Sequence, residues 1–147
     1  MADRLSAEQR SRNMSHCRGK DTSIEIKVRK YLFHHGFRYR KNVKGLPGVP
    51  DIVLPKYRTV IFVHGCFWHR HPNCKKASMP ATRVDFWQEK FQKNVLNDER
   101  HNEELQKLGW NVIVIWECEI KQDFETIMQR VVNDLNANYL SQYIEEN

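Results

Sequence analysis

The sequence predicts an α/β fold in which a mixed β-sheet is flanked by helices. The first observation is the order of its elements: stretches with helical periodicity and runs of β-forming residues follow one another as helix, three strands, helix, strand, helix. The second is size, because 147 residues with 40% hydrophobic side chains can fill one core but not two ordinary ones. We therefore expect residues 21–147 to form a single domain, preceded by a basic arm over residues 1–20.

The composition favours a cytoplasmic protein with a polyanionic partner. The net charge is +6, which indicates such a partner only weakly, since many basic proteins bind no nucleic acid. No hydrophobic run approaches the roughly 18–20 residues that cross a bilayer, and residues 1–6 lack the hydrophobic core of a signal peptide. We expect no membrane partner. In a reducing compartment the four cysteines are expected as metal ligands or free thiols.

The arm over residues 1–20 has little with which to pack. It is either a solvated terminus or a segment that follows a phosphate backbone and becomes ordered on binding. Cys17 is far from the other cysteines and is expected as a free thiol. The basic residues of the arm are Arg10, Arg12, Arg18 and Lys20.

The first helix is expected to begin at residues 21–23, where short polar residues precede Glu25 in the first turn. Gly36 is suited to end it. Glu25 lies near the hydrophobic face and either completes the helix cap or supports a site. That face carries Ile24, Val28, Tyr31 and Leu32.

Three strands are expected next, over residues 37–43, 49–54 and 59–64. The turn at residues 45–48 and the short connection at residues 55–58 are so tight that neighbouring strands must be antiparallel. Val60 to Val63 is an unbroken run of β-formers and is typical of a buried strand.

The second half of the chain begins with an irregular loop over residues 65–82. A long helix is expected over Asp85–Leu108, with a hydrophobic stripe at Trp87, Phe91, Val95, Leu105 and Leu108. The hydrophobic run from Trp110 to Trp116 predicts a buried strand. A last amphipathic helix is expected over Asp123–Leu140.

Four metal-ligand residues stand out: Cys66, His71, Cys74 and Cys118. A Cys3His set is a standard composition for structural zinc. The irregular loop has too few hydrophobic residues to fold alone, so a metal would fix it, and Cys118 would tie it to the sheet. The alternative is that the two outer cysteines are ordinary buried thiols and His71 is solvated.

An acidic and histidine site is the second constellation. If the strands over residues 51–54 and 59–64 pair, Asp51 lies beside the end of the strand that carries His64. A carboxylate there can hold Mg2+ with a backbone carbonyl, and a neutral histidine such as His69 can take a proton from water. Alternatively, Asp51 is an ordinary strand-start acid and His69 is a further zinc ligand.

Adjacent aromatic residues occur twice, at Phe67-Trp68 and at Phe86-Trp87. Neighbouring side chains of an extended segment point in opposite directions, so we do not expect Phe67 and Trp68 to enter the same core. Hydrophobic wedges of this kind unstack base steps in DNA. The alternative is that the rings pack around the loop, and Trp87 shares the helical phase of the core residues.

These blocks together resemble the very short patch repair (Vsr) family of DNA mismatch endonucleases, from about Arg12 to Cys118. The resemblance is carried by Pro50-Asp51, His64-Gly65-Cys66-Phe67-Trp68-His69, Pro80-Ala81-Thr82-Arg83 with Phe86-Trp87, and Val114-Ile115-Trp116-Glu117-Cys118. It implies a restriction-endonuclease-like αβββαβ core with a structural zinc loop. It also implies a Mg2+-dependent nick 5′ to the thymine of a T:G mismatch left by deamination of 5-methylcytosine.

The resemblance also implies roles for individual residues. Asp51 and the Val63 carbonyl would hold Mg2+, His69 would be the general base, and His64 and Glu25 would complete the catalytic set. The zinc ligands would be Cys66, His71, Cys74 and Cys118, and the rings that enter DNA would be Phe67, Trp68 and Trp87.

Two departures leave questions open. The third strand lacks the Asp/Glu-x-Lys of related nuclease folds, and the spacing from His71 to Cys74 is one residue longer than in the family, which makes His69 a rival zinc ligand. The alternative functions are a restriction-like endonuclease on matched or modified DNA and a non-catalytic zinc-containing DNA-binding module.

The partners implied are double-stranded DNA with a T:G mismatch, the mismatch-repair protein MutL, and a functional link to a cytosine-5 DNA methyltransferase. The resemblance also implies a bacterial, nucleoid-associated protein. Because the lesion is asymmetric and one strand is cut, we expect a monomer.

Overall fold

The run of β-formers forms β3 (Thr59–His64), an inner strand of a four-stranded sheet. The protein is described by a computed structural model that covers residues 22–146. The strand order is β1 (Arg40–Lys41), β2 (Ile52–Leu54), β3 and β4 (Asn111–Trp116). The first three strands pair antiparallel, as predicted, and β4 pairs parallel with β3. The sheet is therefore mixed.

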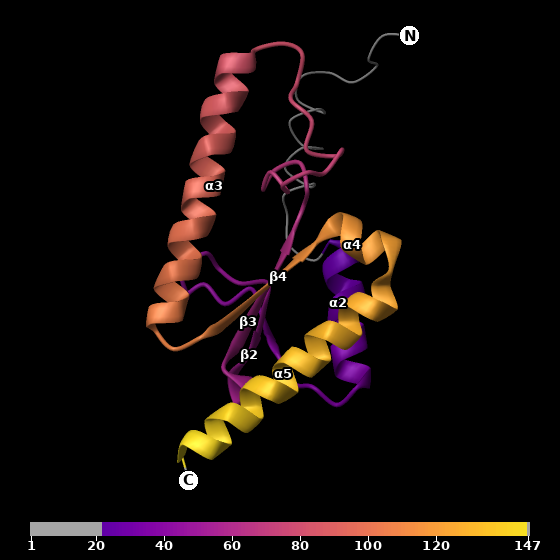
Figure 1. The fold of residues 1–147 in the computed structure, drawn as a ribbon, viewed down its shortest axis with the longest axis vertical. Coiled ribbons are helices and arrows are strands. Elements are labelled where there is room, and N and C mark those ends of the chain that lie inside the picture. The colour runs from indigo at the N-terminus through magenta and orange to yellow at the C-terminus, as the bar shows by residue number, and fades with distance from the viewer. Residues whose placement is uncertain (1–21, 147) are drawn as a thin grey trace.

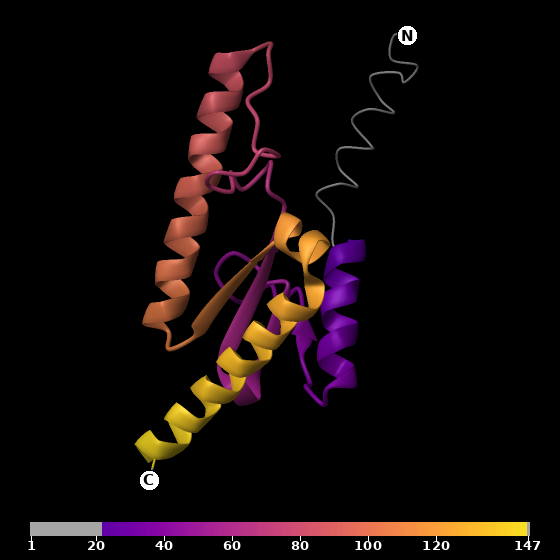
Figure 2. The same cartoon turned by 45° about the vertical axis from the view of Figure 1, so that its right-hand side comes forward.

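Helices cover both faces of the sheet, and strand alternation decides which residues meet them. On one face α2 (Ser23–His34), α4 (Glu117–Gln122) and α5 (Phe124–Glu146) lie together, while α3 (Val84–Lys107) lies on the other (Figures 1 and 2). The first face buries Ile52, Leu54, Ile61 and Ile115 with Val28, Leu32, Met128 and Leu135 of the helices. The second buries Val53, Val60, Phe62 and Leu105.

The first helix confirms the sequence prediction. Thr22 is its N-cap, and its hydroxyl oxygen accepts a hydrogen bond from the Glu25 backbone N–H at 3.3 Å. The helix ends at His34, and Gly36 follows with φ +87°, a conformation that glycine adopts without steric cost.

Two strands are shorter than predicted. The strand expected over residues 37–43 is reduced to β1 because Asn42 turns the chain with φ 51°. The strand expected over residues 49–54 begins only at Ile52. Val49 has φ 49°, which is unusual for a β-branched residue, and Pro50 has no N–H to donate to a sheet.

The C-terminal third also departs from prediction. β4 was expected to be buried, but only Ile115 is, because β4 is an edge strand of the described sheet. A short helix, α4, follows it directly, with the Glu119 carboxylate accepting from the Trp116 N–H at 3.2 Å. The last helix then runs past Leu140 to Glu146. Leu108, expected in the stripe of α3, lies beyond its end and is exposed.

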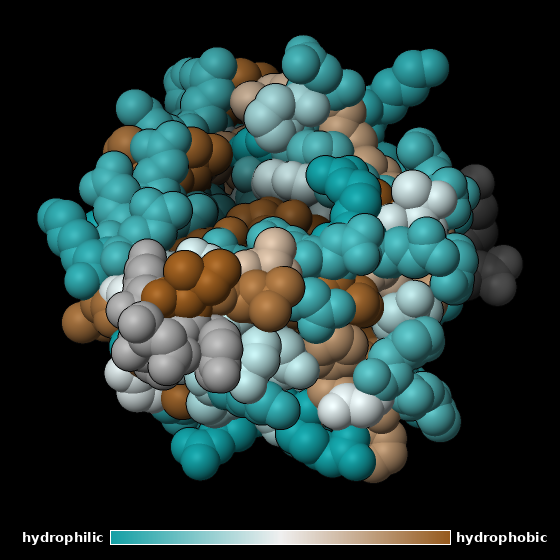
Figure 3. Space-filling view, turned by 60° about the horizontal axis from the view of Figure 1, so that its bottom comes forward, coloured by the Kyte–Doolittle hydropathy of each residue, from teal (hydrophilic) through white to brown (hydrophobic). Residues whose placement is uncertain are grey.

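The C-terminal helix packs on the turn between β2 and β3. That turn is the 3₁₀ helix η1 (Pro55–Tyr57), whose Tyr57 carbonyl accepts from the Asn138 amide at 2.6 Å and from the Gln142 amide at 3.3 Å. Seen from the end that carries the C-terminus, the surface is largely hydrophilic with separate hydrophobic areas (Figure 3).

Two expectations concern other parts of the chain. Within residues 22–146, no helix combines the length and the hydrophobicity needed to cross a bilayer. The basic arm expected over residues 1–20, with Cys17, lies outside the described residues.

Candidate active site and metal centre

A cavity of about 850 Å³ opens where β3 ends. Its walls come from the start of α2, the loop between β1 and β2, the end of β3, the loop that follows, and one side of α3. All four expected catalytic residues line it: Glu25, Asp51, His64 and His69. The fold thus brings together residues that lie up to 44 positions apart in the sequence.

Asp51 lies beside Val63, as strand pairing predicted. The Asp51 Oδ2 accepts a hydrogen bond from the Val63 backbone N–H at 2.7 Å. From the sequence, the Val63 carbonyl was expected as the second Mg2+ ligand beside Asp51. In a strand the N–H and C=O of one residue point toward the same neighbouring strand, so this carbonyl also faces the Asp51 side. Burial is the main reason why the pKa of Asp51 is raised to about 6; the Val63 N–H acts to lower this pKa, and the nearby Glu25 acts to raise it.

Glu25 is only 5% exposed, although its residue type is rarely buried. Its backbone N–H takes part in the helix cap, while its side chain lines the cavity near enough to Asp51 to raise that residue's pKa. Arg29, one turn further along α2, is equally buried and lowers the pKa of Asp51. Two buried carboxyl groups at one wall of a cavity are the ligand type that a hard cation prefers.

His64 and His69 lie face to face, with ring centroids 3.8 Å apart and planes within 3°. His69 Nδ1 is 2.7 Å from the Asp98 Oδ2 on α3. A proton on Nδ1 satisfies this carboxylate and leaves Nε2 as the acceptor. Burial, together with the neighbouring His69, lowers the pKa of His64 to about 3, so His64 stays neutral. Its buried Nδ1 has no hydrogen-bond partner within residues 22–146.

Asp98 was not among the residues predicted for the site. It belongs to a polar stripe on α3 that lines the cavity and comprises Lys90, Asn94, Asn97, Asp98 and His101. These positions follow the spacing of one helix face, a signal that was present in the sequence. Only the hydrophobic stripe of this helix was singled out from the sequence, because nothing local shows that a cavity wall lies opposite its polar side.

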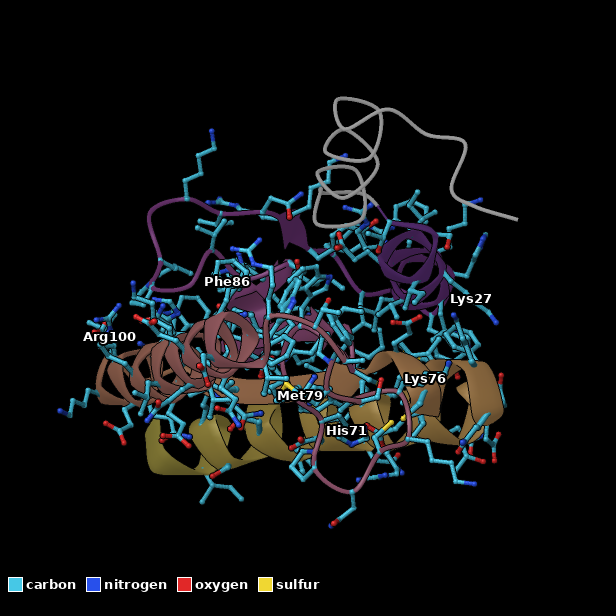
Figure 4. The ribbon with its side chains drawn as sticks, turned by 90° about the horizontal axis from the view of Figure 1, so that it is seen from above. Lys27, His71, Lys76, Met79, Phe86 and Arg100 are labelled. Atoms are coloured by element: carbon cyan, nitrogen blue, oxygen red, sulfur yellow. The ribbon has the colours of Figure 1, made fainter. Side chains whose placement is uncertain are left out.

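The four expected zinc ligands also come together. The ligand atoms of Cys66, His71, Cys74 and Cys118 all lie within 4.8 Å of one another, and His71 Nδ1 is 3.3 Å from the Cys118 sulfur. Figure 4 looks down on the loop on which His71 is labelled. His69 is instead grouped with His64 and Asp98, whose ligand atoms also lie within 4.8 Å of one another. The geometry therefore groups His71, and not His69, with the cysteines.

The chemistry of this cluster suits a soft cation. Burial raises the pKa of the Cys66 thiol to about 12, whereas the Lys76 backbone N–H holds the pKa of Cys74 below its usual value. A bound metal ion would favour the thiolate of each cysteine. His71 is fixed by stacking on Trp116 of β4, with centroids 4.3 Å apart. A set of three sulfurs and one ring nitrogen in so small a volume fits tetrahedral zinc.

The aromatic residues form one group between the loop and α3, which we call the aromatic cluster: Phe67, Trp68, Phe86, Trp87 and Phe91. Neighbouring rings have centroids between 5.2 and 6.1 Å apart. Phe91 is its buried base, while Phe86 is 43% exposed. The three expected intercalating residues thus pack on one another in this structure, and Phe67 and Trp68 also line the cavity. The Trp68 carbonyl accepts a hydrogen bond from the Asn94 amide at 3.1 Å.

Comparison with known proteins gives a consistent result. The sequence profile of the family described as "DNA mismatch endonuclease Vsr" matches residues 2–76. The chain is 46% identical over 121 residues to the DNA mismatch endonuclease Vsr of Escherichia coli, which covers 82% of this chain and 77% of that protein.

Two nicking enzymes are similar over comparable lengths. The type II nicking enzyme V.NmeAIP of Neisseria meningitidis is 50% identical over 121 residues, 82% of this chain and 86% of that protein. V.XorIIP of Xanthomonas oryzae is 43% identical over 138 residues, 94% of this chain and all of that protein.

Proposed function

Because the chain belongs to the Vsr family of DNA mismatch endonucleases, and is therefore a strand-specific DNA endonuclease, we propose that it nicks DNA 5′ to the thymine of a T:G mismatch. Such a mismatch arises when 5-methylcytosine deaminates, and the nick would start very short patch repair. The observation that carries the proposal is the convergence of Asp51, His64 and His69 in one cavity beside the aromatic cluster.

The residues at the cavity wall fit a magnesium ion. Asp51 and the carbonyl of Val63 would hold it, with Glu25 supporting the site from the first helix. When bound, Mg2+ stabilises the charge that develops on the phosphate oxygens. A bound cation would also lower the raised pKa of Asp51, because it favours the ionised carboxylate.

His69 is suited to take the proton from the attacking water. The hydrogen bond between Nδ1 and Asp98 fixes the ring, so that Nε2 carries the free lone pair. Asp98 also stabilises the imidazolium that forms when the proton arrives. The neutral ring of His64 supports His69 by stacking and, as in the family, would lie near the scissile phosphate.

Zinc at Cys66, His71, Cys74 and Cys118 would have a structural role. It would hold the irregular loop to the start of α4, where Cys118 lies. The loop carries both His69 and the rings Phe67 and Trp68, so the metal would fix catalytic and recognition residues at once. With Trp87, these rings would be inserted beside the mismatch and would unstack its bases.

The remaining assignments belong to the same proposal. The observed element order agrees with a restriction-endonuclease-like αβββαβ core. We propose residues 21–147 as one domain and residues 1–20 as an arm that follows the DNA backbone. The proposed setting is a monomer in the bacterial cytoplasm, associated with the nucleoid, with MutL and a cytosine-5 methyltransferase as functional partners.

The catalytic assignment is tested by single-turnover nicking of a T:G duplex. Asp51→Asn and Asp98→Asn should each lower the rate at least about 100-fold, the usual range for losing a metal ligand or an oriented base. DNA affinity should change little, because neither variant removes a recognition residue. Asp134→Asn, an exposed aspartate on α5, is the matched control and should act like the wild type. Normal nicking by Asp51→Asn would refute the assignment.

A further inference from the structure

Arg70 lies in the irregular loop, next to His71 in sequence, and has no role in the mechanism described above. It is partly buried and has φ 54°, a backbone conformation that is uncommon for a residue other than glycine. Ordering a long arginine side chain costs conformational entropy, so specific contacts must offset that cost. The contacts of its guanidinium group show what it holds.

The guanidinium group binds three backbone carbonyls from two parts of the loop. Nη1 donates to the Phe67 carbonyl at 3.2 Å and to the Ser78 carbonyl at 3.2 Å, and Nη2 donates to the Ala77 carbonyl at 2.6 Å. The outgoing and returning limbs of the loop are therefore joined through one side chain. Hydrogen bonds from a charged donor are stronger than those between neutral groups.

The same group also contacts the aromatic cluster. Its central carbon lies 4.0 Å from the centroid of Phe91, the buried base of the cluster, and 5.6 Å from that of Phe67. Arg70 thus holds Phe67 through its carbonyl and also packs against Phe91, whose ring meets that of Phe67 edge to face with centroids 5.2 Å apart. Trp68 is held separately, by the Asn94 amide.

We propose that Arg70 is a positioning residue for mismatch recognition, which holds Phe67 ready for insertion between bases. This inference rests on the proposed function, because it concerns how Phe67 is held for its proposed insertion beside the mismatch. Without these contacts of Arg70, Phe67 would have to become ordered each time the protein binds DNA. The free-energy cost of that ordering would weaken binding to the mismatch. Recognition of the mismatch would weaken more than binding to matched DNA.

The planar fork of arginine matters here, and its charge alone does not suffice. Two nitrogens reach three carbonyls that lie in different directions, and the flat group stacks on a ring. A lysine ammonium has the charge but neither the fork nor the flat face. Arg70→Lys therefore separates a positioning role from simple attraction to phosphates.

The test compares the wild type with Arg70→Gln and Arg70→Lys on a T:G duplex and on the matched C:G duplex. We expect the ratio of the two dissociation constants to fall about tenfold in both variants, within the range for a lost base–aromatic contact. A 2-aminopurine base beside the mismatch should show a smaller fluorescence increase on binding, because less unstacking occurs. Arg130→Gln, an exposed arginine on α5, is the charge-matched control and should keep the full ratio.

A double-mutant cycle with Phe67→Ala tests whether Arg70 acts through Phe67. We expect Arg70→Gln to change the ratio less than twofold once the ring is absent. Zinc content, measured on each variant, should stay at one equivalent per chain. Full discrimination by Arg70→Lys, additive losses in the cycle, or loss of zinc from both variants would each overturn the proposal.

The wild type distinguishes this inference from the function on which it rests. If the wild type does not prefer the T:G duplex, the proposed function fails, and the inference fails with it. If the wild type prefers the T:G duplex and both Arg70 variants do so equally well, only the inference fails.

Discussion

At Asp51, burial and cation binding act in opposite directions on one carboxyl group. Burial raises its pKa to about 6, whereas an ordinary aspartate has a pKa of 3.8. Between these values the carboxyl group is protonated in the folded protein and ionised in the unfolded chain. The folded protein therefore loses stability from this group as the pH rises through that window, and a bound cation would restore it.

This competition predicts how magnesium dependence changes with pH. Below about pH 6 a cation must displace a proton from Asp51, so the half-saturating Mg2+ concentration should rise, approaching tenfold per pH unit. Above pH 7 it should be constant. Nicking rates measured against Mg2+ concentration at several pH values check this. A half-saturating concentration that is the same at pH 5 and pH 7 would contradict the account.

Individual residues also show what the sequence could and could not predict. Asp51 and His64 were found because they stand at the ends of two strands whose pairing the tight turn dictates, and His69 was found because it lies in the loop just beyond His64. Asp98 was missed, since its contact with His69 spans 29 positions and depends on how α3 lies across the sheet. Arg70 was missed because its partners are backbone carbonyls, which every sequence offers equally.

At the scale of elements, Arg70 joins the two limbs of the loop between β3 and α3, and a metal ion bound by the four clustered ligands would join the loop to α4. The loop's length and irregularity were evident from the sequence, and so were its ligands. Its path was not, because three of its residues have positive φ: Arg70, Asn73 and Arg83. Backbone conformations of this kind have no reliable signature in residues other than glycine.

Removing the metal should therefore loosen the structure as well as the chemistry. Chelation of zinc should lower the thermal midpoint, because ligand binding and folding of the loop are coupled. Cys74→Ser should have the same effect without a chelator. Scanning calorimetry of the holoprotein, the chelated protein and the variant measures it. A chelated protein that keeps its midpoint would show that the cluster does not hold a structural metal.

The C-terminal helix α5 carried no recognisable motif, yet its contacts indicate a supporting role. The Asn138 amide donates a hydrogen bond to the Tyr57 carbonyl in the turn that joins β2 to β3. Asp51 directly precedes β2, and His64 is the last residue of β3. Asn138→Ala should lower the free energy of unfolding by about 1 kcal/mol, the usual contribution of one hydrogen bond. Asn136→Ala, exposed on the same helix, is the matched control.

Denaturant unfolding of the two variants distinguishes this local contact from a general loss of helix stability. Asn136→Ala should be neutral or slightly stabilising, because alanine has a higher helix propensity than asparagine. Equal destabilisation by both substitutions would mean that the contact with the turn does not account for the effect. The Tyr57 carbonyl also accepts from Gln142, so the loss in Asn138→Ala should be partial.

At the scale of the whole molecule, the sequence was sufficient for the order of elements, the antiparallel pairing of the first three strands and the position of the long helix. Hydrophobic periodicity and short turns determine these features locally. The burial of β4 was overestimated because a sequence does not reveal that a strand lies at a sheet edge. The position of α3, which lies across the cavity from the end of β3, depends on tertiary packing and could not be predicted from local sequence patterns.

The central claim is that this cavity nicks one strand of mismatched DNA. The most direct test incubates the protein and Mg2+ with a duplex that carries a T:G mismatch in a methylated-cytosine context, and with its C:G counterpart, each strand labelled separately. We predict a single nick 5′ to the thymine and no product from the C:G duplex. Cleavage of the C:G duplex at the same rate would contradict mismatch specificity, and binding to both duplexes without any nick would contradict the catalytic claim.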